Sequence, residues 1–545
     1  MDTQRLVLFV IFSFSLLLLW DSWQKEQQPA PARPPAQTAP ALDQAPTPRA
    51  NLSGAAPAQP ATQTVLQHGE RIRVRTDLVE ATIDTVGGDL RGLELLKQRD
   101  AVDPKKPFVL FEDHPNALYV AQSGFIDSVL PTHKALYKAV ATQYTLAPGA
   151  KDLKVSLEWQ GDGVTVEKTY TFHRDSYLID LSYTIHNNSG AALKPEAYFQ
   201  LLRHGRPPAG DPKFVHTYTG VAVYTDKEKF HKISFPDIEK GKETLPPKST
   251  DGWIAVLQHY FLSAWLPPRN AEREFYTKAV GQDLYSAGVI LPVGTIAPGG
   301  SDTLTVGLYA GPQEQAKLEA LAPGLNLTVD YGWLTIIATP IFWVLSAIHR
   351  LVGNWGVAII LLTVLLKLAF YPLSAKSYRS MAQMRLLTPR LQKLKEQYGD
   401  DRQKLHQAMM ELYKTEKVNP LGGCLPIVVQ IPVFISLYWV LLATVELRQA
   451  PFVLWIHDLS APDPYYVLPI VMGITMLIQT KLNPTPPDPI QAKVMMIMPL
   501  AFSIFFLFFP AGLVLYWLVN NILSITQQWY ITRSLERAKA EHGKR

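Results

Sequence analysis

Residues 494–530 read VMMIMPLAFSIFFLFFPAGLVLYWLVNNILSITQQWY, a stretch without a single Asp, Glu, Lys or Arg. Such a stretch is too apolar for the surface of a water-soluble fold, and it is long enough for two membrane crossings at about 20 residues each. The sequence FPAG at 509–512 divides it, because Pro and Gly form tight turns between helices. We therefore expect two antiparallel membrane-spanning helices, 494–509 and 512–530.

Working outward from this pair, further apolar stretches predict four more spans, at 6–23, 355–375, 421–443 and 465–482. The first is either a cleaved signal peptide or an uncleaved anchor. Because the first small-x-small sequence, at Ala30 and Ala32, comes well after the apolar run, we favour the anchor. The fold class is thus a polytopic α-helical membrane protein with six spans.

Residues 331–352 are apolar and rich in Trp, contain Pro340, and end in the polar pair His349-Arg350. They form either another span or an amphipathic helix lying in the membrane interface. The position of Pro340 and the apolar stretch that follows at once favour the interfacial helix.

The composition excludes several classes of function. The 545 residues carry a net charge of only +5 and 18% charged side chains, which leaves no general nucleic-acid footprint. The single cysteine, Cys424, excludes an intramolecular disulfide framework and a cysteine-rich zinc site. The sequence contains no HExxH, GxSxG, Walker-type or GxGxxG motif. We expect no enzyme activity, no cofactor and no metal.

The Lys and Arg residues of the short loops predict the orientation. They outnumber acidic residues in loop 376–420 and in the tail 531–545, whereas loop 444–464 holds only Arg448. Residues 1–5, the hairpin-like loop 376–420, the loop 483–493 and the basic tail then face the cytoplasm. The long segment between the first two spans and loop 444–464 face the exterior.

That exterior segment has two parts. Residues 24–64 are rich in Pro and Ala and predict an extended tether. Residues 65–325 alternate apolar and polar side chains, with a hairpin signal at Gly161-Asp162-Gly163, and predict one large β-sandwich. Sugar binding by this sandwich, and with it a membrane-tethered carbohydrate enzyme, is an alternative that rests on fold alone.

The spans share one asymmetry: their polar residues lie in the cytoplasmic halves. Lys367 is the one ionisable residue well inside a span, and Thr363 lies one helical turn before it. Gln430, Ser503, Asn520 and Asn521 occupy similar depths in other spans. Lys367 alone could snorkel to the interface. The shared pattern instead predicts a hydrated cavity that opens towards the cytoplasm and ends partway across, since a channel needs a polar lining along its full length. An inward-facing secondary transporter is the alternative.

Loop 376–420 predicts a helical hairpin that carries Met and basic residues. Met381, Met384, Met409 and Met410 suit variable apolar partners, and Arg385 suits lipid headgroups or ribosomal RNA. The alternative is that the Met side chains pack the hairpin while the basic residues follow the positive-inside rule.

Several ordered strings resemble the YidC family of bacterial membrane protein insertases. They are VDYGW (329–333), VGNWG (352–356), KVNPLGGCLP (417–426), VELRQAPF (445–452), LWIHDL (454–459), DPYY (463–466) and FPAGLVLY (509–516). The resemblance covers 330–530 densely, and the anchor, tether and β-domain are similar to the Gram-negative form.

The resemblance implies an inner-membrane insertase and chaperone that acts alone or with the Sec translocon. Its five-helix core encloses a hydrophilic groove; Lys367 stands where the family commonly has Arg, Thr363 and Tyr516 match groove positions, and Trp517 replaces a frequent Tyr. The implied partners are nascent membrane proteins, Sec and its accessory subunits, the ribosome and lipids. The β-domain is then periplasmic and both termini are cytoplasmic.

Overall fold

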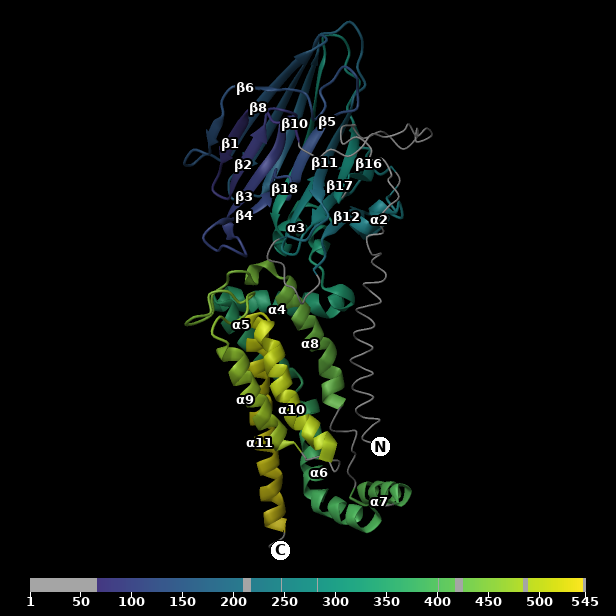
Figure 1. Cartoon of the computed structure of the whole chain (residues 1–545), viewed down its shortest axis with the longest axis vertical. Helices are drawn as coiled ribbons and strands as arrows, with labels where there is room; N and C mark the ends of the chain where they lie inside the picture. Colours follow the sequence, from purple (N-terminus) through teal and green to yellow (C-terminus); the bar gives the residue numbers. More distant parts are fainter. Residues whose placement is uncertain are drawn as a thin grey trace. The chain divides into compact units, whose positions relative to one another are not determined.

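The computed structural model describes residues 66–208, 217–246, 248–281, 283–399, 401–416, 425–483 and 489–542. They fall into two compact units that divide between Val329 and Asp330, a β-unit followed by a helical unit (Figure 1). The predicted anchor 6–23 and tether 24–64 lie outside the described residues.

The β-unit contains two large sheets. The first has the order β16-β17-β11-β5-β3-β2-β1-β7, with β4 paired to β3. Its strands are β1 (Arg71–Arg75), β2 (Val79–Asp84), β3 (Asp89–Arg99), β4 (Pro107–Phe111), β5 (Tyr119–Phe125), β7 (Gln143–Thr145), β11 (Glu196–His204), β16 (Glu274–Gly281) and β17 (Leu284–Pro292).

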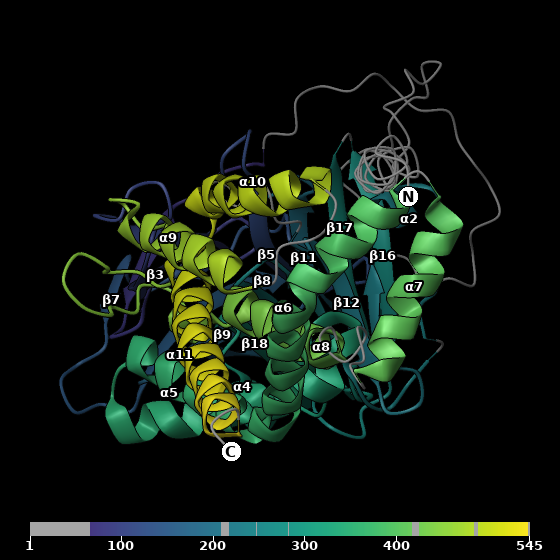
Figure 2. The same ribbon diagram turned by 90° about the horizontal axis from the view of Figure 1, so that it is seen from below.

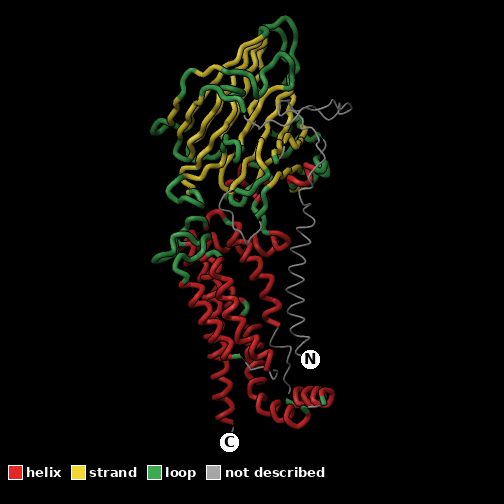
Figure 3. The backbone as a smooth tube through the Cα atoms, in the orientation of Figure 1, coloured by secondary structure: helices red, strands yellow, loops and turns green. Residues whose placement is uncertain are grey.

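The second sheet has the order β13-β12-β14-β15-β18-β10-β9-β8-β6. Its strands are β6 (Lys138–Ala139), β8 (Asp152–Gly161), β9 (Val164–His173), β10 (Leu178–Asn187), β12 (Gly220–Thr225), β13 (Lys229–Ile233), β14 (Trp253–Leu257), β15 (Phe261–Leu266) and β18 (Ser301–Pro312). Short helices α2 (Phe235–Glu239), α3 (Gln315–Leu321) and η2 (Leu325–Thr328) complete the unit. Figure 3 shows that the β-unit consists mainly of strands, drawn in yellow, and the loops between them.

The predicted hairpin between β8 and β9 is confirmed. Gly161 pairs with Val164, so that Asp162 and Gly163 alone form the turn. Both turn residues have positive φ, 48° and 74°. This is the geometry of a two-residue turn whose twist matches the flanking strands, and it explains why Asp-Gly stands there.

The core of the β-unit lies between the two sheets. Phe199 of β11 and Trp265 of β15 meet across it, with ring centroids 5.2 Å apart. Ser123 of β5 and Tyr183 of β10 share a hydrogen bond of 2.9 Å in the same layer. Because both sheets turn their apolar faces towards this cluster, the predicted β-sandwich is confirmed.

The helical unit begins at Asp330. Its elements are η3 (Gly332–Leu334), α4 (Thr335–Val352), α5 (Trp355–Ala369), α6 (Tyr371–Tyr398), α7 (Arg402–Thr415), α8 (Leu425–Ala443), η5 (Val445–Leu447), α9 (Val467–Leu482), α10 (Pro489–Phe505), η6 (Phe506–Phe508) and α11 (Ala511–His542). Figure 2, seen from below, shows α6 and α7 extending beside the other helices.

Helix boundaries differ from the predicted ones at three places. The helix predicted over 355–375 ends at Ala369, and the chain bends by 68° into α6, which has a proline in its first turn. Helix α10 begins inside the predicted loop 483–493, and α11 runs through most of the predicted tail 531–545. The tail continues the helix because 531–542 contains neither Gly nor Pro.

The number of spans is not established by helix length. Among the described residues, α4 is long and apolar enough to cross a membrane on its own, and the bent pair α5–α6 passes the same test jointly. The apolar parts of α8, α9 and α10 are shorter. Helix α4 ends at Val352 and is capped by Gly353, whose φ of 68° lets its N–H bond to the His349 carbonyl at 2.7 Å. In Figure 1, α4 lies across one end of the helical unit.

Candidate functional site

The polar residues of the helical unit meet where α5, α9 and α11 run side by side. Lys367 lies in the last turn of α5, where a cation is favoured by the helix dipole. Its Nζ donates to Ser524 Oγ at 2.7 Å, and the Ser524 hydroxyl donates to the Asn520 carbonyl, also at 2.7 Å. The structure gives Lys367 no acidic partner among the described residues. Among the described residues, its positive charge is therefore held by a neutral acceptor, the Ser524 hydroxyl.

Two further links join α9 to α11 at this end. Asn521 donates to Thr475 Oγ1 at 3.4 Å, and Gln479 donates to Gln528 Oε1 at 3.3 Å. Thr475 and Gln479 are four residues apart, as are Ser524 and Gln528, so each pair shares a helix face. We call the set formed by Lys367, Thr475, Gln479, Asn521, Ser524 and Gln528 the polar end of the bundle.

The polar end, and two α11 side chains next to it, contain polar atoms that have no hydrogen-bond partner among the described residues. Gln479 Oε1, Gln527 Nε2 and Trp517 Nε1 are buried and have no partner among the described residues. Buried polar atoms are normally satisfied by protein or by water. These three atoms are groups that water or a polar guest would satisfy.

Thr363 and Gln430 occupy different surroundings. Thr363 is buried one turn before Lys367, and its hydroxyl donates to the Ile359 carbonyl of its own helix at 2.7 Å. Gln430 is half-buried on α8 and makes no hydrogen bond to the described residues. Of these two residues, Gln430 is the one whose side-chain amide has no hydrogen-bond partner among the described residues and so is free for a guest.

Ser503 lies between α9 and α10 and does not join the polar end. Its hydroxyl donates to the Pro469 carbonyl at 2.9 Å. A Cβ added at Gly473 would lie 2.6 Å from Ser503 Oγ, so that the serine fills the space above a glycine. Its observed contacts are those of helix packing.

Tyr516 and Trp517 belong to an aromatic cluster beside the polar end. Tyr516 stacks on Phe434 of α8 at 5.8 Å between centroids, and Trp517 meets the same ring edge-on at 4.6 Å. Trp517 also contacts Phe506 at 5.7 Å. The cluster forms an apolar wall between α8, η6 and α11.

The sequence pattern missed two members of this site. Gln528 donates to the Leu482 carbonyl and to Asn483 Oδ1, at 3.2 and 3.1 Å. Tyr378 of α6 has its hydroxyl near the side chains of Ser524 and Gln479. The spacing of Gln528 from Ser524 could have pointed to the first, whereas Tyr378 stands in a segment predicted to be cytoplasmic and carried no signal.

Comparison with known proteins shows to which family the chain belongs. The family model for the YidC periplasmic domain matches residues 71–344, and that for the 60Kd inner membrane protein matches 347–539. The membrane protein insertase YidC of Methylobacillus flagellatus is 61% identical over 99% of this chain and 99% of its own. The YidC of Nitrosospira multiformis is 57% identical over 100% and 99%. The chain belongs to the YidC family.

The names of its relatives and of the matching family model show that this YidC family member is a membrane protein insertase of the inner membrane. It is not an enzyme. Its substrates are nascent membrane proteins. The β-unit is the periplasmic domain. An active YidC insertase crystal structure covers 86% of this chain and 94% of its own, at 19% identity and a TM-score of 0.41.

In the α6–α7 hairpin of this YidC protein, two of the predicted contact residues are used for packing. Met384 and Met409 pack against buried Leu387 and Leu391. Met381 is half-buried, and Met410 remains 43% exposed. The side chain of Arg385 lies outside the described residues. The hairpin therefore presents Met410 to solvent, and its other methionines only in part or not at all.

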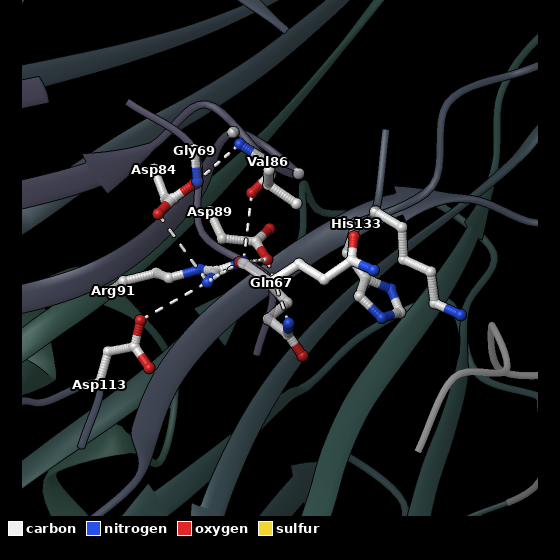
Figure 4. Close-up of polar contacts among 12 residues, drawn as sticks. Gln67, Gly69, Asp84, Val86, Asp89, Arg91, Asp113 and His133 are labelled. Carbon is white, nitrogen blue, oxygen red and sulfur yellow. Dashed lines mark hydrogen bonds and ion pairs between the residues drawn. The ribbon is translucent and has the colours of Figure 1, made fainter. Parts of the chain in front are cut away.

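The periplasmic domain holds a cluster of buried charges at the β2–β3 turn (Figure 4). Arg91 donates to the Gln67 carbonyl at 2.6 Å and lies 3.5 Å from Asp113. Lys168 donates to the Gly87 carbonyl at 2.8 Å and lies 3.8 Å from Asp89.

Burial shapes the ionisation of this cluster. It raises the pKa of Asp89 to about 6 against the pull of Lys168 and Arg91. Burial also lowers the pKa of Lys168 to about 8. Because Lys168 and Asp89 are fully covered, the cluster joins the two sheets and offers no reactive surface.

A cavity of about 420 Å³ on this domain brings Asp180, Asp226 and Asp251 together. Their oxygens are engaged by the domain itself. Asp251 accepts from the Asp226 backbone N–H at 2.6 Å and from Ser249 Oγ at 2.6 Å. Asp180 accepts from His173 at 2.9 Å.

Proposed function

We propose that the polar end is the floor of a hydrophilic groove that receives the hydrophilic segment of a membrane protein during insertion. Lys367 supports this proposal most directly, because its ammonium group lies inside the bundle without an acidic partner among the described residues. A cation in that setting attracts carboxylates, and the polar neighbours reduce the cost of moving a short hydrophilic segment out of water.

The aromatic cluster supplies the other half of the mechanism. Tyr516, Trp517 and Phe434 form an apolar wall next to the polar end. A client that rests its polar segment near Lys367 can lay its apolar segment against this wall and the exposed apolar faces of α9 and α10. It then slides into lipid without a covalent step.

Six spans, with both termini in the cytoplasm, remain our proposal for the topology. The bent α5–α6 pair, α8, α9, α10 and α11 supply five of them, and the predicted anchor 6–23 supplies the sixth. Helix α4 then lies in the membrane interface. Its exposed apolar side chains, Ile336, Trp343 and Leu351, suit that place.

We further propose that the α6–α7 hairpin and the basic tail meet the ribosome and lipid headgroups, and that some clients arrive through the Sec translocon and its accessory subunits. The exposed Met410 and the basic composition of 376–420 support the first contact. The inward-facing secondary transporter is not favoured, because the relatives are insertases.

The groove can be tested with a photoreactive amino acid at Gln430. Gln430 is half-buried and makes no hydrogen bond to the described residues, so the substitution breaks no described hydrogen bond. We expect it to cross-link the hydrophilic segment of a nascent two-span protein. The same probe at Ile336, which is 88% exposed on α4, is the control and should not cross-link that segment. Equal cross-linking at both sites would contradict the groove.

A further inference from the structure

The loop between α8 and α9 binds the start of α5 through one side chain. Asn354 Oδ1 accepts from the Val357 N–H at 3.0 Å and so caps α5. Its Nδ2 donates to the Phe452 carbonyl at 3.0 Å and lies 3.3 Å from the Pro451 carbonyl. The Phe452 ring lies directly on Gly356, where an added Cβ would come within 2.1 Å of it. Asn354 therefore has two separate roles: its Oδ1 caps α5, and its Nδ2 binds the loop between α8 and α9.

The same loop binds the start of α9 through Asp463. This carboxylate is 1% exposed and accepts three hydrogen bonds. Its Oδ1 accepts from Trp455 Nε1 and from the Tyr465 N–H, both at 3.0 Å, and its Oδ2 accepts from the Leu468 N–H at 2.8 Å. Leu468 lies in the first turn of α9, where backbone N–H groups have no partner within the helix. A buried charge satisfied in this way fixes the loop to the helix.

Backbone hydrogen bonds join the loop to the start of α11. The Ala511 N–H donates to the Ala461 carbonyl at 2.8 Å, and the Gly512 N–H donates to the Leu459 carbonyl at 2.9 Å. An added Cβ at Gly512 would lie 3.2 Å from that carbonyl, so the approach is close. Figure 1 shows this loop at the end of the bundle where α11 begins.

The loop is held in an unfavourable backbone conformation. Gln449, Leu454 and Tyr466 have φ values of 59°, 55° and 58°, in the left-handed region that residues with side chains rarely adopt. Such a conformation is unfavourable for a residue with a side chain and persists only where the surroundings hold it. The loop is thus constrained by its contacts.

The opposite end of the three helices is held differently. Among the described residues, α5, α9 and α11 are linked there by side-chain bonds such as Lys367–Ser524 and Asn521–Thr475, and α11 has no backbone-to-backbone bond there like the two that join its start to the loop. Side-chain bonds of this kind can exchange for bonds to water or to a guest.

We propose that segment 450–466 is a fixed clamp on α5, α9 and α11, so that these helices separate only at the polar end when a client enters. Asn354 and Asp463 are then positioning residues for insertion. This inference rests on the proposed groove, because it says which end of the bundle yields to the client.

Hydrogen exchange of the full-length protein in lipid nanodiscs tests the clamp directly. The probe is a ribosome-bound nascent chain of a two-span protein with an acidic exported segment. On binding, we expect faster amide exchange in 475–483 and 520–528 and unchanged protection in 450–466 and 511–514. Faster exchange in the clamp segments, with the polar end unchanged, would overturn the proposal.

Variants separate positioning from folding. Asn354→Asp keeps the cap acceptor and removes the donor to Phe452, and Asp463→Asn removes the charge. Each should lower the insertion rate roughly fivefold, the effect of a change of about one hydrogen bond. Asp463→Glu keeps both carboxylate oxygens and should restore part of the rate.

Asp458→Asn is the matched control in the same loop, because among the described residues Asp458 accepts only from the Ser460 N–H and hydroxyl, at 2.8 and 2.7 Å. It should leave the rate unchanged. A loss equal to that of Asp463→Asn would contradict a specific role for Asp463. Lys367→Ala tests the groove separately from the clamp. If the variant inserts clients as fast as the wild-type chain, the proposed groove is wrong. The clamp is tested by the hydrogen-exchange pattern, which does not depend on Lys367.

Discussion

The ammonium group of Lys367 in α5 donates a 2.7 Å hydrogen bond to the Ser524 hydroxyl in α11. Ser524 in turn donates to the Asn520 carbonyl, so that the cation is oriented by a neutral chain of acceptors. A neutral partner holds the side chain in place and leaves its charge available to a client.

Replacing Lys367 by Ala should therefore impair some clients more than others. We expect a roughly tenfold loss of insertion for a client whose exported segment is acidic, which corresponds to about 1.4 kcal/mol, and a smaller loss for a neutral one. Lys367→Arg should be tolerated, because it keeps the charge. Protease protection of the two clients in liposomes measures both effects.

The control for that experiment is Lys481→Ala. Lys481 is exposed in the last turn of α9 and makes no ion pair with the described residues. It should have no effect on either client. Equal losses for the acidic and the neutral client with Lys367→Ala would remove charge attraction as the explanation and leave hydration.

Gly473→Ala should destabilise the packing of α9 on α10. The new methyl group would lie 2.6 Å from Ser503 Oγ, and overpacking of this kind costs about 1–3 kcal/mol. The double variant with Ser503→Gly should recover most of the loss, because it removes the contacted atoms. Thermal unfolding in detergent follows both. If Gly473→Ala unfolds at the same temperature as the wild-type chain, α10 shifts away from α9 at no cost and the prediction is wrong.

Lys168→Met should destabilise the periplasmic domain. It removes one of the two cations beside the fully buried Asp89 and leaves Arg91 at 3.9 Å, a loss that costs up to about 3–5 kcal/mol. Lys154→Met, on the exposed face of neighbouring β8, should stay within about 0.5 kcal/mol. Pulse proteolysis in urea reports the stability of this domain in the full chain. Similar values for the two variants would mean that Asp89 becomes protonated at little cost.

His173 makes the stability of the domain depend on pH. Burial lowers its pKa, but hydrogen bonds from its ring to Asp152 and Asp180 outweigh that and raise the pKa above its usual 6.5. The stabilisation is complete below the unfolded value and is lost as pH rises through the folded one. We expect His173→Gln to cost more stability at pH 5.5 than at pH 8.5. Equal costs at the two pH values would contradict the raised pKa.

The sequence predicted the β-unit well because alternation and turn residues are local properties. The turn at Asp162-Gly163 is an example, since Asp-Gly between alternating strands suits few other structures. It also predicted that polar residues gather in one half of the spans, because hydropathy along a helix is visible without knowing its partners.

Contacts that depend on helix rotation could not be predicted. Ser503 stands in the apolar stretch 494–509, where no polar face sets the rotation of the helix, so nothing in the sequence says that it faces Gly473. The pairing of Lys367 with Ser524 joins residues far apart in the chain, and the roles of Asp463 and Asn354 depend on loop geometry. The bend after Ala369 was missed because the apolar pattern continues across it.

The measurement that tests the central claim most directly is insertion by the purified protein alone. A small two-span protein with an acidic exported segment is synthesised in the presence of liposomes that contain either the wild-type chain or Lys367→Ala. We expect protease protection of the exported segment with the wild-type chain and a clear loss with the variant. Equal protection in both would contradict a groove centred on Lys367.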